Sequence, residues 1–88
     1  MYKFDVSANL QNILKKLSNR DVTTYNRILD KINEVTNSEN VEHYKNLRAD
    51  MKDSKRVQIG HFVLVFKYDK NTNRILFDDF DHHDTIYK

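Results

Sequence analysis

The chain has no cysteine and no proline, and it has a single glycine, Gly60, among its 88 residues. Without cysteine there is neither a disulfide framework nor a thiolate metal site, which suits the reducing cytoplasm. No apolar run approaches the roughly 20 residues that a membrane-spanning helix needs, and residues 1–5 do not begin like a signal peptide. We therefore expect a cytoplasmic protein without a membrane partner.

The chain also has little net charge, +2 at pH 7, although its charges are unevenly spread. The stretch 41–56 has five basic residues against three acids, whereas the stretch 74–88 has two basic residues against four acids. This is not the charge pattern of a strong nonspecific nucleic-acid binder, which would be basic throughout. An anionic partner must therefore be met locally, or with the help of another molecule.

The first half of the chain predicts one strand and two amphipathic helices. Residues 1–6 alternate as a short strand, and Ser7 is a candidate N-cap for a helix whose apolar stripe is Leu10, Ile13, Leu14 and Leu17. Asn19 or Asp21 is expected to cap a second helix, which ends at residues 36–38. Its predicted apolar stripe consists of Val22, Tyr25, Ile28, Leu29, Ile32 and Val35.

The second half predicts three strands. Residues 55–60 alternate, with Val57 and Ile59 on one face and Arg56 and Gln58 on the other, and Gly60 ends the run. Residues 62–66 are almost all apolar, which indicates a central strand covered on both faces. A turn at 69–73 and a strand at 75–80 follow. We expect one α+β domain, residues 1–88, of order β-α-α-β-β-β, with a helical hairpin on one face of a small, mostly antiparallel sheet and the other face open.

Three segments of the chain resemble a known family. The run KRVQIGHFVLVF, residues 55–66, is similar to the strand–glycine–strand core of the RelE/ParE toxin superfamily. The end HHDTIYK, residues 82–88, is similar to that family's C-terminal signature, and HYKNLR, residues 43–48, is similar to its Lys-Leu segment. The order and length of the elements agree with the same family over the whole chain.

This resemblance implies a toxin of a type II toxin–antitoxin system with the RelE/ParE-like fold. RelE-like members are ribonucleases that enter the ribosomal A site and cut mRNA, whereas ParE-like members poison DNA gyrase. The implied partners are an antitoxin that covers the active face, the ribosome and mRNA, with no cofactor and no small-molecule ligand. A catalytically inactive, antitoxin-binding homologue is a third possibility.

The sequence departs from the family pattern at three places. Val63 stands where RelE-like nucleases usually have arginine, and His83 replaces a basic neighbour of the C-terminal histidine. Asp78, Asp79 and Asp81 make an acidic run that is unusual on a surface that faces RNA. These changes leave both the nuclease and the gyrase inhibitor open.

RNA cleavage through the 2′-hydroxyl needs a base, a cation for the phosphate and an acid, and it needs no metal. Histidine suits proton transfer because its unperturbed pKa is about 6.5, and arginine can grip two phosphate oxygens. We expect one histidine at most in the site, because neighbours in extended chain face opposite ways, and we prefer His82 to His83. The candidate catalytic residues are Arg56, His82, His83 and Tyr87, and the candidate RNA-binding residues are Lys45, Arg48, Lys52 and Lys55.

Other interpretations of the same residues compete with this one. The possible metal ligands near the C-terminus are Asp79, Asp81, His82, His83 and Asp84, but no remote cluster completes a shell, so we predict no metal site. The aspartates are expected to be an exposed strand end that pairs with an antitoxin or restrains Arg56. We interpret Lys55 more readily as a solvated edge residue, and Tyr87 could simply close the core.

Overall fold

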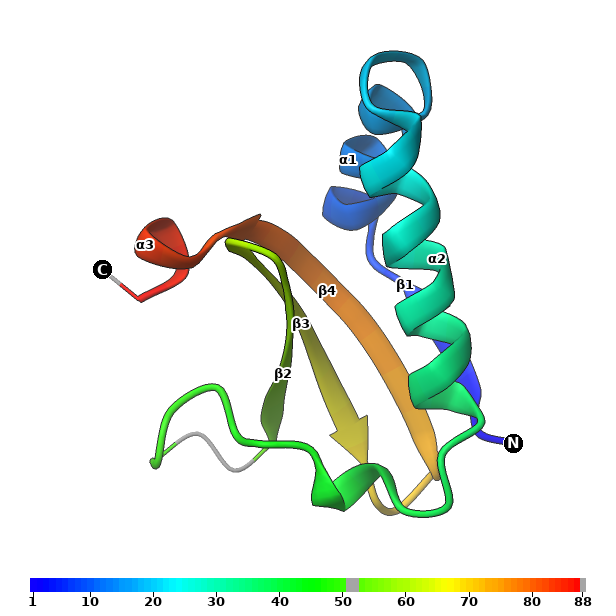
Figure 1. The fold of residues 1–88 in the computed structure, drawn as a ribbon. Coiled ribbons are helices and arrows are strands. Elements are labelled where there is room, and N and C mark those ends of the chain that lie inside the picture. Colours follow the sequence, from blue (N-terminus) through cyan, green and yellow to red (C-terminus); the bar gives the residue numbers. More distant parts are fainter. Residues whose placement is uncertain (51–52, 88) are drawn as a thin grey trace.

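The computed structural model describes residues 1–50 and 53–87. Its elements follow in the order β1 (Lys3–Val6), α1 (Ala8–Arg20), α2 (Val22–Thr36), the 3-10 helix η1 (Val41–His43), β2 (Ser54–Ile59), β3 (Phe62–Asp69), β4 (Arg74–His82) and α3 (His83–Ile86). The predicted order of strands and helices is confirmed, and η1 and α3 are additions that the sequence did not indicate. Figure 1 shows α1 and α2 on one side of the sheet and α3 on the other.

Local polar contacts fix both ends of the helical hairpin. The Ser7 side chain accepts a hydrogen bond from the Leu10 amide at 3.1 Å and caps α1, as predicted. Asp21 caps α2, because its carboxylate accepts the Thr24 amide and the Thr24 hydroxyl at 3.1 and 2.6 Å. The hydroxyl and amide of Thr24 also lower the pKa of Asp21 below its ordinary value, since they stabilise the carboxylate.

The sheet has the strand order β1-β4-β3-β2. β1 pairs parallel to β4, whereas β2–β3 and β3–β4 are antiparallel, so the predicted mostly antiparallel sheet is confirmed. Gly60 has φ +62°, a left-handed conformation that glycine adopts without the steric cost of a side chain, and it turns the chain between β2 and β3. Residues 63–66 of β3 are all buried, which confirms the central strand covered on both faces.

The core lies between the helical hairpin and one face of the sheet. Its buried members are Leu10, Ile28, Ile32, Val35, Val41, Ile59, Leu64, Phe66, Ile75, Phe77 and Phe80. Two residues of the expected stripe on α2 are not covered: Val22 is 56% exposed and Leu29 is 39% exposed. The prediction was wrong there because periodicity shows which side of a helix is apolar, not how much of that side its neighbours reach.

A short segment extends the sheet beyond β2. The Arg56 amide donates to the Lys45 carbonyl at 3.0 Å, and the Leu47 amide donates to the Ser54 carbonyl at 2.8 Å. Asn46 forms an isolated antiparallel bridge with Lys55. Segment 45–47 therefore covers the outer edge of β2, which would otherwise expose unpaired backbone groups.

Candidate active site

The chain's end returns over the face of the sheet opposite the helical hairpin, here called the second face. The His83 amide donates to the His61 carbonyl at 2.9 Å, which ties the start of α3 to the β2–β3 turn. Thr85 and Ile86 of α3 line a hollow above Val65. Val63 and Val65 are only 1% and 5% exposed. The expectation of an open second face is therefore wrong in part, because the tail and neighbouring residues bury its apolar centre.

Arg56 lies on the second face, as the alternation of β2 predicts. Val57 and Ile59 contribute to the core on the hairpin side, so Arg56 and Gln58 point the other way. The Arg56 Nε donates to the Asn46 carbonyl at 3.2 Å. Its Cζ lies 5.6 Å from the centroid of the Tyr87 ring, within the range of a cation–π contact. The guanidinium is therefore held from two sides.

Tyr87 and His83 complete a cluster with Arg56. The ring centroids of His83 and Tyr87 are 4.6 Å apart, with an interplanar angle of 48°. The Tyr87 hydroxyl oxygen is buried, and no described residue is its hydrogen-bond partner. Buried polar atoms almost always have partners, so this phenol is a candidate for contact with a ligand. The cluster joins a cation, an exposed imidazole and a phenol from segments more than 25 residues apart in the sequence.

His82 faces away from this cluster. Its Nδ1 accepts the Asp84 amide at 3.2 Å and caps α3. Its ring lies 6.3 Å from that of His61 and 5.5 Å from that of Phe62. The structure places His83, and not the preferred His82, beside Tyr87, because the chain turns from strand into helix after His82. The expectation that the two histidines point in different directions agrees with this geometry.

The candidate RNA-binding residues differ in their exposure to solvent. Lys45 and Arg48 are exposed. Lys52 lies outside the described residues. Lys55 is only 7% exposed, and its ammonium donates to the Tyr44 carbonyl at 3.2 Å and to Asn46 Oδ1 at 2.9 Å. The interpretation of Lys55 as a solvated residue is wrong, because it shares the inward face of β2 with Val57 and Ile59.

Asn46 is a residue that the sequence analysis missed. Its carbonyl accepts from Arg56 and its side chain accepts from Lys55, so it positions both basic residues of β2. An asparagine in a segment without periodicity gives no signal for such a role. A shallow hollow beside it is lined by His43, Tyr44, Lys45, Arg56, Val57 and Gln58. Burial raises the pKa of the Tyr44 phenol in this hollow above its ordinary value.

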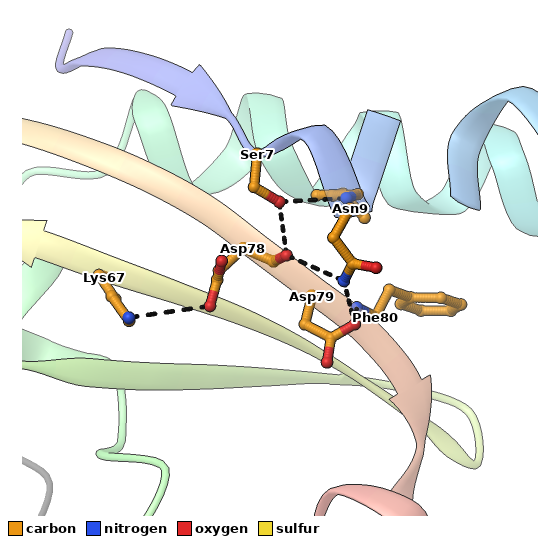
Figure 2. Close-up of polar contacts among 7 residues, drawn as sticks. Ser7, Asn9, Lys67, Asp78, Asp79 and Phe80 are labelled. Carbon is orange, nitrogen blue, oxygen red and sulfur yellow. Dashed lines mark hydrogen bonds and ion pairs between the residues drawn. The ribbon is translucent and has the colours of Figure 1, made fainter. Parts of the chain in front are cut away.

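The aspartates of β4 are half-buried and engaged, contrary to the expected exposed strand end. Figure 2 shows how the start of α1 ties down Asp78 and Asp79: the Ser7 hydroxyl donates to the Asp78 carbonyl at 2.6 Å, and Asn9 Nδ2 donates to Asp79 Oδ1 at 3.0 Å. The Lys67 ammonium lies 3.9 Å from Asp78 Oδ2. Asp81 Oδ1 accepts the His82 amide at 2.7 Å. Within residues 1–50 and 53–87, no ion pair joins an aspartate of β4 to Arg56.

Two absences hold for the part of the chain that the structure describes. No group of three or more His, Asp or Glu side chains there is placed to hold a metal ion. None of its helices is long and apolar enough to cross a membrane.

Comparison with known proteins defines the class of the chain. No family model matches it. A chain of Methanocaldococcus jannaschii named "Putative toxin RelE4" is 49% identical over 89 residues, covering 100% of this chain and 93% of that protein. An uncharacterized protein of Methanosarcina mazei is 40% identical, covering 99% of this chain and all of that protein. The fold resembles a chain in the crystal structure of the toxin–antitoxin complex RelBE2 from Mycobacterium tuberculosis, with a TM-score of 0.60 at 20% identity, covering 93% of this chain and 98% of that one.

These matches place the chain among small α+β proteins of the toxin class. The chain belongs to the RelE family of toxins.

Proposed function

We propose that this protein is the toxin of a toxin–antitoxin pair and that it is a metal-independent, ribosome-dependent endoribonuclease that cuts mRNA and so stops translation in the cytoplasm. The observation that carries this proposal is the convergence of Arg56, His83 and Tyr87 on the second face. The RelE membership supports the toxin class, and the cluster supplies the chemistry.

Each member of the cluster suits one part of RNA cleavage. The His83 imidazole takes the proton of the 2′-hydroxyl as that oxygen attacks the neighbouring phosphorus. The Arg56 guanidinium stabilises the charge that develops on the phosphate oxygens. The Tyr87 hydroxyl gives its proton to the 5′-oxygen as the bond from that oxygen to phosphorus breaks, which leaves a cyclic phosphate on the upstream fragment.

The low net charge supports dependence on the ribosome. A net charge of +2 supplies little general attraction for RNA, so a partner that already holds the mRNA must bring it to the site. Lys45 and Arg48, both exposed beside β2, are suited to contact RNA there. Lys55 acts instead as a positioning residue, because its ammonium holds segment 44–46 next to Arg56.

We expect the antitoxin to cover the second face. A related fold occurs in a crystal structure of a toxin–antitoxin complex. A segment laid over Arg56 and Tyr87 would exclude RNA without altering the core.

The test is a cell-free translation reaction in which RNA ends are mapped after the purified protein is added. The wild-type protein is expected to give cuts in phase with codons. Arg56→Ala is expected to slow cleavage by about 100- to 1,000-fold, the usual loss when one stabiliser of developing charge is removed. Arg74→Ala is the matched control, because Arg74 pairs with Asp5 on β1 at 3.1 Å and takes no part in the cluster.

A second candidate is inhibition of DNA gyrase, and Val63 favours it. This residue is 1% exposed on the second face, and the resemblance to nucleases implies an arginine there. Intact mRNA together with accumulated cleaved DNA would support this candidate over the nuclease. Intact mRNA and intact DNA would indicate a homologue that only binds an antitoxin.

A further inference from the structure

A second group of rings lies at the end of the sheet, next to the proposed site but outside it. Its members are His61 from the β2–β3 turn, Phe62 at the start of β3 and His82 at the end of β4. The rings of His61 and His82 are stacked with centroids 6.3 Å apart, and Phe62 meets His82 edge-on at 5.5 Å. Phe62 also stacks on the buried Phe80 at 5.1 Å. We call His61, Phe62 and His82 the ring platform.

The platform faces solvent. Phe62 is 39% exposed although it is a large apolar residue, and both histidines are exposed. Phe80 beneath it is 5% exposed, so the platform has a fixed base in the core. It offers flat rings together with polar ring edges, and it includes one exposed phenylalanine rather than a broad apolar patch. A protein-docking surface is usually larger and more apolar than this.

The hydrogen bonds of His82 leave one ring edge available. Its Nδ1 accepts the Asp84 amide, so the neutral ring carries its proton on Nε2. That N–H can donate to an acceptor on a ligand. The Asp84 carboxylate lies 3.8 Å from the same Nδ1, and its negative charge disfavours a phosphate there and favours an uncharged nucleobase as the ligand.

A cation borders the platform on the hairpin side. Arg27 of α2 reaches the turn, since its Nη1 would lie 3.6 Å from a Cβ at Gly60. Arg27 can therefore meet a phosphate while a neighbouring base occupies the rings. On the other side, the His83 amide donates to the His61 carbonyl, which connects the platform to the proposed site.

We propose that the ring platform is a nucleobase subsite that takes an unpaired base of single-stranded RNA where the RNA passes the end of the sheet beside the cluster of Arg56, His83 and Tyr87. Exposed aromatic and imidazole rings stack on splayed-out bases in this way, and their edges hydrogen-bond to the base. The proposal rests on the proposed nuclease function, and it makes His61 and Phe62 determinants of which nucleotides are cut.

The test measures base stacking rather than cleavage. The full chain is titrated into ribosomes whose A site holds a short mRNA in which 2-aminopurine replaces one base and a 2′-O-methyl group prevents cleavage. Phe62→Leu keeps an apolar side chain of similar size and removes the flat ring. Phe4→Leu is its matched control, because Phe4 is 38% exposed and also packs on a core phenylalanine, but on β1 at the far edge of the sheet.

Wild type and Phe4→Leu are expected to quench the fluorescence equally. Phe62→Leu and His61→Ala are each expected to bind on the order of tenfold more weakly. Ribosomes that carry an mRNA with an abasic nucleotide at the probe position, used as competitors without the fluorescent base, should bind Phe62→Leu and Phe4→Leu equally. Equal binding of the two leucine variants to the 2-aminopurine mRNA, a difference between them that persists on the abasic competitor, or no quenching by wild type would each overturn the subsite.

The translation assay separates this failure from failure of the nuclease proposal. If the nuclease acts as proposed, Phe62→Leu should redistribute cuts among codons, whereas Arg56→Ala should suppress them all. Wild type that cuts nothing in translation but still quenches 2-aminopurine would refute the nuclease and retain the base-binding subsite.

Discussion

β2 and β4 both carry polar side chains next to the second face, but the two strands use them in opposite ways. On β2, Arg56 reaches toward the tail and lies over the Tyr87 ring. On β4, Asp78 and Asp79 are engaged by Ser7, Asn9 and Lys67 (Figure 2). The proposed chemistry therefore lies on the β2 side, while the Asp78 carbonyl and the Asp79 carboxylate join the start of α1 to the sheet.

The comparison teaches that charge at a strand position does not by itself indicate a binding role. Lys55 and Arg56 are adjacent basic residues of one strand, yet one is buried as a structural donor and the other lies on the proposed active face. The partners of each side chain decide its role. Four substitutions test this division between strands.

The largest effect on stability is expected from Lys55→Ala. It removes a buried ammonium and leaves the Tyr44 carbonyl and Asn46 Oδ1 without their donor, at a cost of about 1–3 kcal/mol in the free energy of unfolding. Urea unfolding followed by circular dichroism measures it. Lys67→Ala is the control, since that side chain is 53% exposed and is expected to change stability by no more than about 0.5 kcal/mol. Equal effects would contradict the structural role of Lys55.

Ser7→Ala tests the β4 side. The hydroxyl caps α1 through the Leu10 amide and donates to the Asp78 carbonyl, so its loss should cost about 1–2 kcal/mol in unfolding free energy. Ser18→Ala, which removes an exposed hydroxyl bonded only within α1, should cost much less. A Ser7→Ala protein as stable as Ser18→Ala would show that the joint between α1 and β4 is unimportant.

Tyr87→Phe separates activity from stability on the β2 side. It removes a buried hydroxyl that has no partner among the described residues, so the free energy of unfolding should stay the same or rise. Cleavage in the translation assay should fall by about 100-fold or more, as expected when a general acid is lost. Tyr68→Phe is the control: it should lower the free energy of unfolding and leave cleavage unchanged. The Tyr68 hydroxyl donates to Asn73 Oδ1 at 2.7 Å, at the opposite end of the sheet. Unchanged cleavage by Tyr87→Phe would mean that the ring only closes the second face.

Asp81→Asn should have the smallest effect, and it should be a gain. Asparagine keeps an oxygen for the His82 amide and removes one negative charge near the proposed RNA path, so cleavage should rise by about twofold at low salt and less at high salt. Asp30→Asn, on the exposed side of α2, is the control for the change in net charge. A large loss of cleavage with Asp81→Asn alone would assign the β4 carboxylates to the chemistry instead.

Much of the fold could be predicted because it depends on local patterns. Ser7 before an apolar stripe marks the start of α1, and the alternation of β2 places Arg56 opposite Val57. The same alternation would have placed Lys55 on the inward face, so that error came from giving charge more weight than position. The expectation that the aspartates of β4 form an exposed strand end was wrong for a different reason. Ser7, Asn9 and the aspartates are about 70 residues apart, and the register shift between Val65 and Phe66 leaves no trace in composition.

The candidate site was predicted by residue type more than by geometry. Arg56, His83 and Tyr87 are all candidates from the sequence. The choice between the two histidines, however, rests on the expectation that His82 and His83 lie in an extended strand. The turn into α3 after His82 reverses which imidazole meets Tyr87. A helix of four residues is too short to show a period in the sequence, and the stacking of His61 on His82 depends on a turn-to-strand contact that only the fold reveals.

The most direct test of the account compares His83→Ala with His82→Ala in the translation reaction with mapped RNA ends. His83→Ala should lower the cleavage rate by about 100-fold or more, the contribution typical of a general base, while His82→Ala should lower it by about tenfold at most. Full loss with His82→Ala and persistent cleavage with His83→Ala would contradict the proposed assembly of Arg56, His83 and Tyr87.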